Sequence, residues 1–412
     1  MALAVPIPPD LEPTVTLAAT TTLAEAAART WGAVVVGAGP AGAAAARELA
    51  RRSTAVLLVD RAAFPRWKVC GCCLNGRAAA VLRAIGLGSL PARCGAVPLT
   101  HMRLAAAGRS ACVPLTGGAA VSREAFDAAL VEAAVAAGAA FLPETRAMLP
   151  EGNPTRGLLD ARPVQLQQGD RRIVAPARIV VAADGLGGSL LGRAAETAPG
   201  ARIGAGAATT EAPDFYQPGV VYMACGAGGY TGMVRLEDGR LDLAAAFDAA
   251  WVRSAGGLGR AAETMVREAG WPAPHRVDEL PWRGTPALTR RPHGVAGERL
   301  FVVGDAAGYV EPFTGEGMAW ALASGAAVAP LAARAAEQWR PEMAQQWTDL
   351  HRRIVGRRQG LCRAAAAVLR RPWLTELAVR LLARVPALAG PVIRRLNRST
   401  PSGFHDLSGQ IL

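Results

Sequence analysis

The 412-residue sequence predicts an α/β protein whose main part is a Rossmann-like dinucleotide-binding domain on a parallel sheet. Two apolar runs, 33–36 and 55–59, flank a glycine-rich turn and an alanine-rich helical segment. A third apolar run, 300–303, leads into a Gly-Asp turn and a second glycine-spaced helix start. Between these blocks lie stretches typical of strands, and from about residue 326 onward the pattern is helical.

These blocks predict a discontinuous first domain with a second domain inserted into it. Strand-like stretches at 220–225, 230–236 and 241–247 are separated by glycine-rich turns, which favours a meander of antiparallel strands. The N-terminal segment is rich in Pro and Thr and lacks the basic start and apolar core of a signal peptide, so we expect a flexible leader. The predicted boundaries are a leader at 1–30, the dinucleotide-binding domain at 31–92, 120–199 and 293–330, a mostly antiparallel substrate domain at 93–119 and 200–292, and a C-terminal helical region at 331–412.

The first glycine-rich turn carries a dinucleotide fingerprint. A G-x-G-x-x-G pattern between a strand and a helix lets the backbone approach a pyrophosphate closely. Asp60 ends the next strand, eighteen residues past Gly42, where an acid can hold the hydroxyls of an adenosine ribose. A tight turn that binds nothing would also favour glycine, but it would not need this acid. The candidate ligands in this part are Gly37, Ala38, Gly39, Pro40, Ala41, Gly42 and Asp60.

The block at 304–318 points to a flavin. Asp305 follows a buried strand, where a carboxylate can bind the hydroxyls of a ribityl chain. Backbone amides at the helix start, from Gly315 through Gly317 to Met318, can face a negative or electron-rich group. A ribityl chain and the N1/O2 edge of a flavin need these two features together. With the first fingerprint, the block predicts FAD and adds Gly304, Asp305, Gly315, Gly317 and Met318 to the candidates.

A third block, at 179–185, is a buried strand that ends in Asp184 and a glycine. The three blocks in this order resemble the FAD-dependent oxidoreductases that share the fold of the aromatic hydroxylases. The Pro-Phe-Thr-Gly-Glu-Gly stretch at 312–317 and the Lys-Val-Cys-Gly stretch at 68–71 are similar to the geranylgeranyl reductase family in particular. The resemblance covers roughly residues 31–330 and implies cofactor contacts from Arg61, Arg123 and Asp184. For Arg123, a solvated arginine at a helix start is the alternative.

The resemblance also implies a hydride transfer that needs a proton donor on the substrate side. The family's Lys-x-Cys-Gly cysteine, here Cys70, is the first candidate for donating or steering that proton, and packing in a tight turn is its alternative. Tyr230 is the second candidate, with packing in the cavity wall as its alternative. The segment 229–234 keeps this tyrosine but lacks the tryptophan and Phe-Pro of the family's lipid tunnel. Gly308 stands where aromatic hydroxylases have histidine, and we find no Trp-x-Trp-x-x-Pro motif of the halogenases.

The sequence therefore predicts an FAD-dependent oxidoreductase, with three functions left open. The first is reduction of carbon–carbon double bonds in a hydrophobic prenyl or polyketide-like lipid, by hydride transfer from reduced FAD. The second is a monooxygenase acting on a hydrophobic or phenolic metabolite, because both chemistries need the same cofactor seat. The third is a non-enzymatic flavin-binding or electron-transfer protein. The expected electron donor is NAD(P)H, although no separate fingerprint for it is visible.

Composition excludes other classes of partner and site. The net charge of +12 comes from 44 arginines and a single lysine, but aromatics make up 5% of the chain, so no nucleic-acid interface is predicted. Seven cysteines without a secretory signal favour free thiols in the cytoplasm. Cys70, Cys72 and Cys73 cluster, but no second cysteine or histidine cluster follows at ligand spacing, so no metal site is predicted.

The C-terminal region combines arginines with a leucine stripe. From residue 352 to 398 there are twelve arginines and one acid, Glu376. Leu374, Leu377, Ala378, Leu381 and Leu382 follow the spacing of an amphipathic helix. Two interpretations remain: a helical cap packed on the core, or peripheral docking on an anionic membrane, which would suit a lipid substrate. The expected location is the cytoplasm, with membrane association under the second interpretation.

Overall fold

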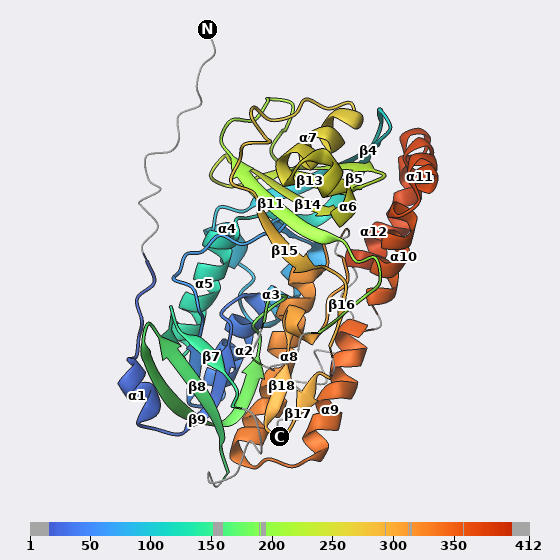
Figure 1. Ribbon diagram of the computed structural model, residues 1–412. Coiled ribbons are helices and arrows are strands. Elements are labelled where there is room, and N and C mark those ends of the chain that lie inside the picture. Colours follow the sequence, from blue (N-terminus) through green and yellow to red (C-terminus); the bar gives the residue numbers. More distant parts are fainter. Residues whose placement is uncertain are drawn as a thin grey trace.

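The computed structural model describes residues 16–150, 160–188, 190, 195–292, 294–311, 313, 315–356 and 358–397 of the chain. Two large sheets lie one above the other, and a column of C-terminal helices runs along one side of both (Figure 1). The first sheet is mainly parallel and the second mainly antiparallel. The predicted α/β class, with a parallel Rossmann-like sheet and a second antiparallel one, is confirmed.

The first sheet has the strand order β17-β18-β9-β1-β2-β6, and from β18 to β6 neighbouring strands are parallel. In its centre Val34 pairs with Leu57 on one side and Val180 on the other, and all three side chains are fully buried. Such continuous apolar runs are typical of parallel strands that are covered on both faces. The strands are β1 (Trp31–Val36), β2 (Val56–Val59), β6 (Ala140–Leu142), β9 (Arg171–Ala182), β17 (Ala296–Gly297) and β18 (Leu300–Val302), and β7 (Arg146–Met148) and β8 (Arg162–Gln168) extend β9 as an antiparallel flap.

Three helices cover one face of the first sheet: α2 (Pro40–Ala50), α5 (Arg123–Ala136) and α8 (Gly317–Glu337). Helices α2 and α8 approach very closely, since a Cβ on Gly325 would lie 2.1 Å from the Ala41 carbonyl oxygen. By length and composition α8 could span a membrane, but 83% of its apolar window is buried inside the protein. Helix α8 is therefore the central core helix of this domain.

The second sheet has the order β15-β11-β14-β13-β12-β4-β5-β3. The predicted meander is confirmed, because β12, β13 and β14 pair antiparallel in sequence order. Helices α6 (Ala249–Ala255) and α7 (Leu258–Glu268) cover its outer face. The strands are β3 (Cys73–Leu74), β4 (Val97–Ala106), β5 (Arg109–Ala120), β11 (Ile203–Thr209), β12 (Val220–Gly226), β13 (Gly229–Arg235), β14 (Leu241–Phe247) and β15 (Arg283–Ala287), and β10 (Glu196–Thr197) pairs separately with β16 (Arg290–Arg291).

The N-terminal region differs from the flexible leader expected over residues 1–30. Residues 1–15 lie outside the described part of the chain, but 16–30 are structured. Helix α1 (Leu23–Ala27) begins with a capping box in which Thr22 and Glu25 bond each other's backbone amides. The Leu17 amide also donates to the Phe64 carbonyl. A threonine three residues before a glutamate was the available signal for this helix.

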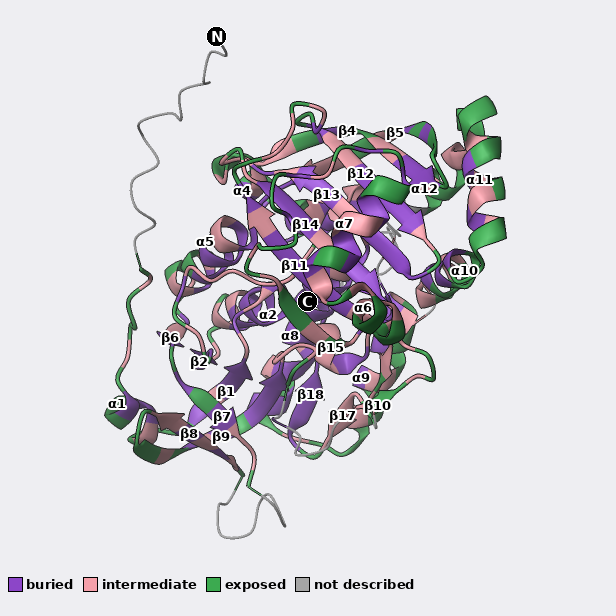
Figure 2. Cartoon of the chain, turned by 45° about the horizontal axis from the view of Figure 1, so that its top comes forward, coloured by how far each residue is buried: buried purple, intermediate pink, exposed green. Residues whose placement is uncertain are grey.

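The remaining helices connect and flank the two sheets. Helix α3 (Gly76–Ala84) packs on α8, and α4 (Leu90–Arg93) packs near α5. The C-terminal helices are α9 (Glu342–His351), α10 (Gln359–Leu369), α11 (Pro372–Arg384) and α12 (Gly390–Asn397). Helix α11 lies against β5 and β4 at the rim of the second sheet, and much of its outer surface is exposed (Figure 2). The C-terminal helices thus form a wall along the space between the sheets.

Candidate functional site

A cavity of about 890 Å³ lies between the ends of the first-sheet strands and the inner face of the second sheet. Its lining is mostly apolar and comes from many parts of the chain. They include the first glycine-rich turn, the cysteine-containing segment at 67–76, the inner face of β12 to β14, the block at 304–318, and helices α11 and α12. The cavity therefore joins the predicted cofactor residues to the C-terminal helices.

The first glycine-rich turn has the backbone shape that its sequence predicts. Gly37 has a φ of +100°, which only glycine adopts easily, and a Cβ on Gly42 would lie 1.7 Å from the Gly37 carbonyl oxygen. Gly39, Pro40 and Ala41 line the cavity. Asp60 supports the turn from behind, since its Oδ2 accepts a hydrogen bond from the Ala38 amide at 2.7 Å. These contacts hold the turn open toward the cavity.

Two arginines bring positive charge to this turn. Arg123 is buried and binds Asp127 through two hydrogen bonds of 2.9 and 2.7 Å, so it is not a solvated helix-start arginine. The Arg66 guanidinium lies 3.3 Å from the same carboxylate. A Cβ built on Gly39 would be 3.5 Å from an Arg66 guanidinium nitrogen and 3.8 Å from one of Arg123. Arg66 was not among the predicted site residues, although it lies between Asp60 and the Lys-Val-Cys-Gly stretch at 68–71.

The second glycine-rich block lies across the cavity from the first. Gly304 and Asp305 form a short 3-10 helix, Gly304–Ala307, and line the cavity. The Asp305 carboxylate lies 3.9 Å from the Lys68 ammonium. Burial and the neighbouring Arg123 charge lower the pKa of Lys68, and Asp305 opposes that shift. Helix α8 starts at the cavity edge without a side-chain cap, and Gly315, Gly317 and Met318 line this edge.

Arg61 and Asp184 also lie at the cavity. The Asp184 carboxylate accepts a hydrogen bond from the Leu190 amide at 2.9 Å, so it shapes its own loop. Together, the described residues fit a flavin dinucleotide on physical grounds. The glycine turn leaves room for a pyrophosphate beside two guanidinium groups, and the uncapped start of α8 presents amides to an electron-rich ring edge.

Cys70, predicted to donate or steer a proton, lies in the cavity wall. The Cys72 thiol donates a long hydrogen bond to the Cys70 carbonyl oxygen at 3.7 Å. The neighbouring Cys72 thiol and the Arg123 guanidinium lower the pKa of Cys70 to about 5. Cys70 is therefore a thiolate at neutral pH, which can accept or steer a proton but has none to donate.

Tyr230 lies on the opposite wall of the cavity, on β13. Its ring packs edge-on against Phe313, with ring centroids 5.2 Å apart, and burial raises the pKa of its phenol well above the usual value. These contacts are those of a side chain that packs in the cavity wall.

Asp242, on the neighbouring strand β14, also lines the cavity and is almost completely buried, but the sequence did not identify it as a candidate site residue. The sequence feature that could have identified it is a single acid in an otherwise apolar strand.

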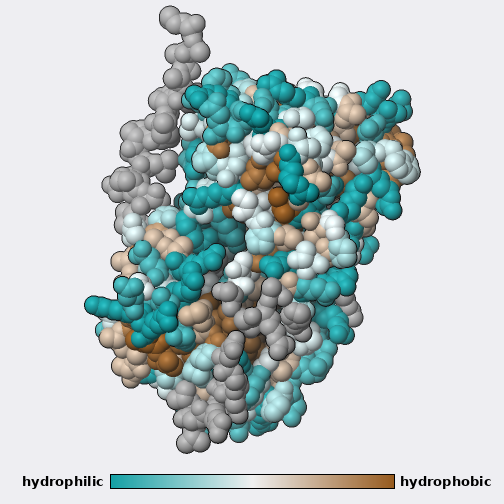
Figure 3. Space-filling view, viewed as in Figure 1, coloured by the Kyte–Doolittle hydropathy of each residue, from teal (hydrophilic) through white to brown (hydrophobic). Residues whose placement is uncertain are grey.

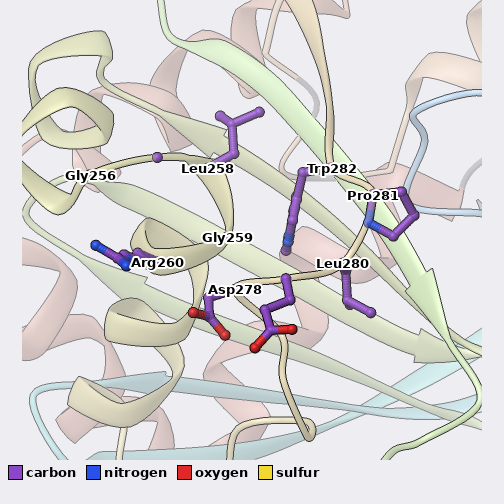
Figure 4. Close-up of a pocket in the computed structure, with 10 residues that line it drawn as sticks. Gly256, Leu258, Gly259, Arg260, Asp278, Leu280, Pro281 and Trp282 are labelled. Carbon is purple, nitrogen blue, oxygen red and sulfur yellow. The ribbon is translucent and has the colours of Figure 1, made fainter.

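A second hollow of about 630 Å³ lies where the start of α7 meets the segment 278–282. Figure 4 shows Arg260, Asp278 and Trp282 around it. The hollow is open to solvent, and the nearby Glu279 pairs with exposed Arg276. The clustered titratable groups with shifted pKa values lie in the first cavity instead, which makes that cavity the candidate active site.

Comparison with known proteins agrees with this geometry. Residues 31–223 match the family model described as an FAD binding domain. The chain is 29% identical over 385 residues to a menaquinone reductase of Mycobacterium tuberculosis, covering 88% of this chain and 89% of that one. It is 31% identical over 324 residues to a menaquinone reductase of Mycolicibacterium smegmatis, covering 72% and 75%.

Solved structures show the same fold at low identity. A geranylgeranyl bacteriochlorophyll reductase-like protein from Thermoplasma acidophilum aligns with a TM-score of 0.71 at 19% identity, over 93% of this chain and 100% of that one. A variant of a flavin-dependent brominase aligns with a TM-score of 0.72 at 15% identity, over 92% and 99%. Because reductase-like proteins and halogenases both align, the fold alone does not separate their reactions.

Proposed function

Because the chain belongs to the FAD-dependent oxidoreductases of the geranylgeranyl reductase family, we propose that it reduces carbon–carbon double bonds in a hydrophobic prenyl or polyketide-like lipid. The observation that carries this proposal is the mostly apolar cavity that connects the cofactor residues to helices α11 and α12. A mostly apolar wall suits a hydrocarbon chain better than a small polar metabolite. The similar menaquinone reductases are named for a quinone that carries a prenyl chain, which is a lipid of this class.

The chain's residues have distinct roles in holding the cofactor. The turn from Gly37 to Gly42 accommodates the pyrophosphate, with Arg66 and Arg123 neutralising its charge. Asp60 would serve the adenosine ribose and Asp305 the ribityl chain. The amides at the start of α8 would stabilise negative charge at the flavin ring edge. When bound and reduced, FAD supplies the hydride. We propose NAD(P)H as the donor that reduces it.

The cavity wall orients the lipid and excludes water. The inner face of the second sheet contributes apolar side chains such as Met102, Leu104, Val221 and Met223. Tyr230 and Phe313 close one side through their edge-on contact. A dry, apolar wall strengthens charge interactions at the polar end of the cavity, where Cys70, Lys68 and Asp305 gather.

We also propose that the C-terminal helices dock on an anionic membrane, from which the lipid would enter. Ala378, Leu381 and Leu382 of the predicted leucine stripe line the cavity, whereas Leu377 does not. Leu377 and Leu381 are both half exposed, so Leu381 lies where the cavity meets the surface. Trp373 adds to this exposed apolar surface, and Leu388 and Val392, which also line the cavity, are half exposed beside it. Hydrophobic residues emerge at the surface over α11, at the upper right of Figure 3. A partner that combines an apolar interior with negative charge matches this surface.

The test starts from the FAD-loaded protein, reduced with dithionite in the absence of oxygen. Menaquinone or geranylgeranyl alcohol is added, and the lipid is analysed by mass spectrometry. We expect a gain of two hydrogens for each double bond reduced. If the lipid is unchanged without oxygen but gains an oxygen atom when air is admitted, the protein is a monooxygenase. If no tested lipid changes with or without oxygen, the non-enzymatic alternative is favoured.

A further inference from the structure

Asp242 is a buried acid in the wall of the cavity. It lies on β14, between β11 and β13 in the middle of the second sheet, and only 2% of the residue is exposed. Its Oδ2 is buried and has no hydrogen-bond partner among the described residues. An ionised carboxylate in such a place costs several kcal/mol unless it is paired. Retaining an acid here therefore suggests a chemical role rather than a structural one.

Burial is the main cause that favours the protonated form of Asp242. Burial raises the pKa of its carboxyl well above the usual value, the Cys70 thiolate and Glu124 raise it further, and the Cys72 thiol and Arg240 lower it. The net direction is upward, so the protonated form of Asp242 is favoured more than in an ordinary aspartate. In that form its carboxyl carries a proton at the cavity wall.

The thiols and phenols in the cavity wall are weaker donors than a carboxyl. Burial raises the pKa of the Cys73 thiol and of the Tyr230 and Tyr309 phenols, and the Cys70 sulfur raises that of Cys72. A carboxylic acid is intrinsically a far stronger acid than a thiol or a phenol. When all of them are buried around one cavity, the carboxyl gives up its proton most readily.

Cys72 holds this arrangement in place. Its φ of +50° lies in the left-handed region, which a residue with a Cβ rarely adopts, and it is buried at the cavity wall. From there its thiol donates a long hydrogen bond of 3.7 Å to the Cys70 carbonyl oxygen, and the thiol also lowers the pKa of Asp242. Unusual backbone conformations of this kind concentrate at functional sites. Cys72 acts as a positioning residue between Cys70 and Asp242.

We propose that Asp242 is the catalytic acid of the reduction, an inference that rests on the proposed function. The π bond of the substrate breaks, and one carbon receives the hydride that reduced FAD supplies as it becomes oxidised. The other carbon forms its new C–H bond with the proton of Asp242, which is left as a carboxylate. Cys70 then steers the proton rather than donating it: its negative charge helps Asp242 retain its proton until the substrate carbon takes it.

The first test needs no turnover. Infrared difference spectra between neutral and alkaline pH are recorded for the FAD-loaded protein and for Asp242→Asn. We expect a protonated-carboxyl C=O band in the wild type at neutral pH, lost in the variant. Thr231→Val is the matched control, because Thr231 Oγ1 is also buried without a described partner, but on the face of β13 opposite Tyr230. An unchanged band in Asp242→Asn would overturn the proposal.

The second test measures lipid reduction by the same three proteins, after confirming that each binds FAD. Asp242→Asn should reduce the lipid about 100-fold more slowly or worse, the usual range for loss of a general acid. The wild-type rate should fall as pH rises through the raised pKa of Asp242, and the residual rate of the variant should lack that step. Wild-type activity in Asp242→Asn would refute the role of Asp242 while leaving the proposed function intact. A wild type that reduces no lipid would instead count against the proposed function.

Discussion

At the scale of single residues, the reactivity of Cys70 follows from its neighbours. Because its pKa is lowered to about 5, Cys70 should react with iodoacetamide as a thiolate at pH 6, where an ordinary thiol of pKa about 8.5 reacts little. Labelling should fall as pH decreases through 5. Mass spectrometry of the labelled peptides measures each cysteine separately, and exposed Cys112 serves as the internal reference. If Cys70 is labelled no faster than Cys112 at pH 6, the thiolate assignment is wrong.

Asp305 provides a test of the cofactor site at the same scale. A hydrogen bond from a hydroxyl to a charged group contributes about 1.5–3 kcal/mol. Asp305→Asn should therefore weaken FAD binding by about tenfold or more, measured by the quenching of flavin fluorescence during titration. Asp349→Asn, an exposed acid on α9, is the control and should bind FAD normally. Equal affinity in both variants would remove Asp305 from the ribityl site.

At the scale of an element, α11 has more apolar surface than the protein itself covers. Trp373, Leu377 and Leu381 are 63%, 45% and 45% exposed, and Arg380 and Arg384 lie on the same helix. Each basic residue near an anionic surface contributes about 1 kcal/mol. Arg380→Ala with Arg384→Ala should therefore lower binding to phosphatidylserine vesicles about 30-fold at low salt, as measured by co-sedimentation.

The controls for α11 separate docking from general charge effects. Arg267→Ala removes an exposed arginine from α7, on the outer face of the second sheet, and should bind vesicles like the wild type. High salt should weaken wild-type binding, and neutral vesicles should bind poorly. If the wild type does not bind anionic vesicles at low salt, α11 is a structural cap only.

At the scale of the whole molecule, a buried ion pair connects the parts of the chain. Arg202, just before β11, lies 3.0 Å from the Glu311 carboxylate and donates to the Leu369 carbonyl at the end of α10. Arg370 lies 3.5 Å from the other Glu311 oxygen. Arg202 and Glu311 are both completely buried, so removing Arg202 leaves the Glu311 charge in the interior with only the more distant, partly exposed Arg370.

Arg202→Met should therefore destabilise the protein by about 3–5 kcal/mol in chemical denaturation. Replacing both partners, Arg202→Met with Glu311→Leu, should cost less than the sum of the single changes, because no unpaired charge remains. Arg267→Met, which breaks an exposed pair on α7, should cost less than about 1 kcal/mol. Strictly additive effects of the two buried substitutions would show that the pair does not couple these regions.

Local rules explain how much could be read from the sequence. The strand–turn–helix around Gly37 to Gly42 was predictable because a backbone that approaches another this closely excludes every side chain. The meander of β12 to β14 was predictable from apolar runs separated by glycines. Helix α1 was not predicted, because its five residues are too few to show an apolar periodicity, although its capping box was present in the sequence.

The sequence by itself determined the fold class, the flavin fingerprints and the meander of β12 to β14. These depend on periodicity, on glycine positions and on acids at strand ends, all within short stretches of chain. The protonation states of the site depended on tertiary structure, because a pKa responds to burial and to charges from distant segments. Folding places Arg123 and Cys72 beside Cys70 and lowers its pKa to about 5, while burial raises the pKa of Asp242, more than 160 residues later in the chain.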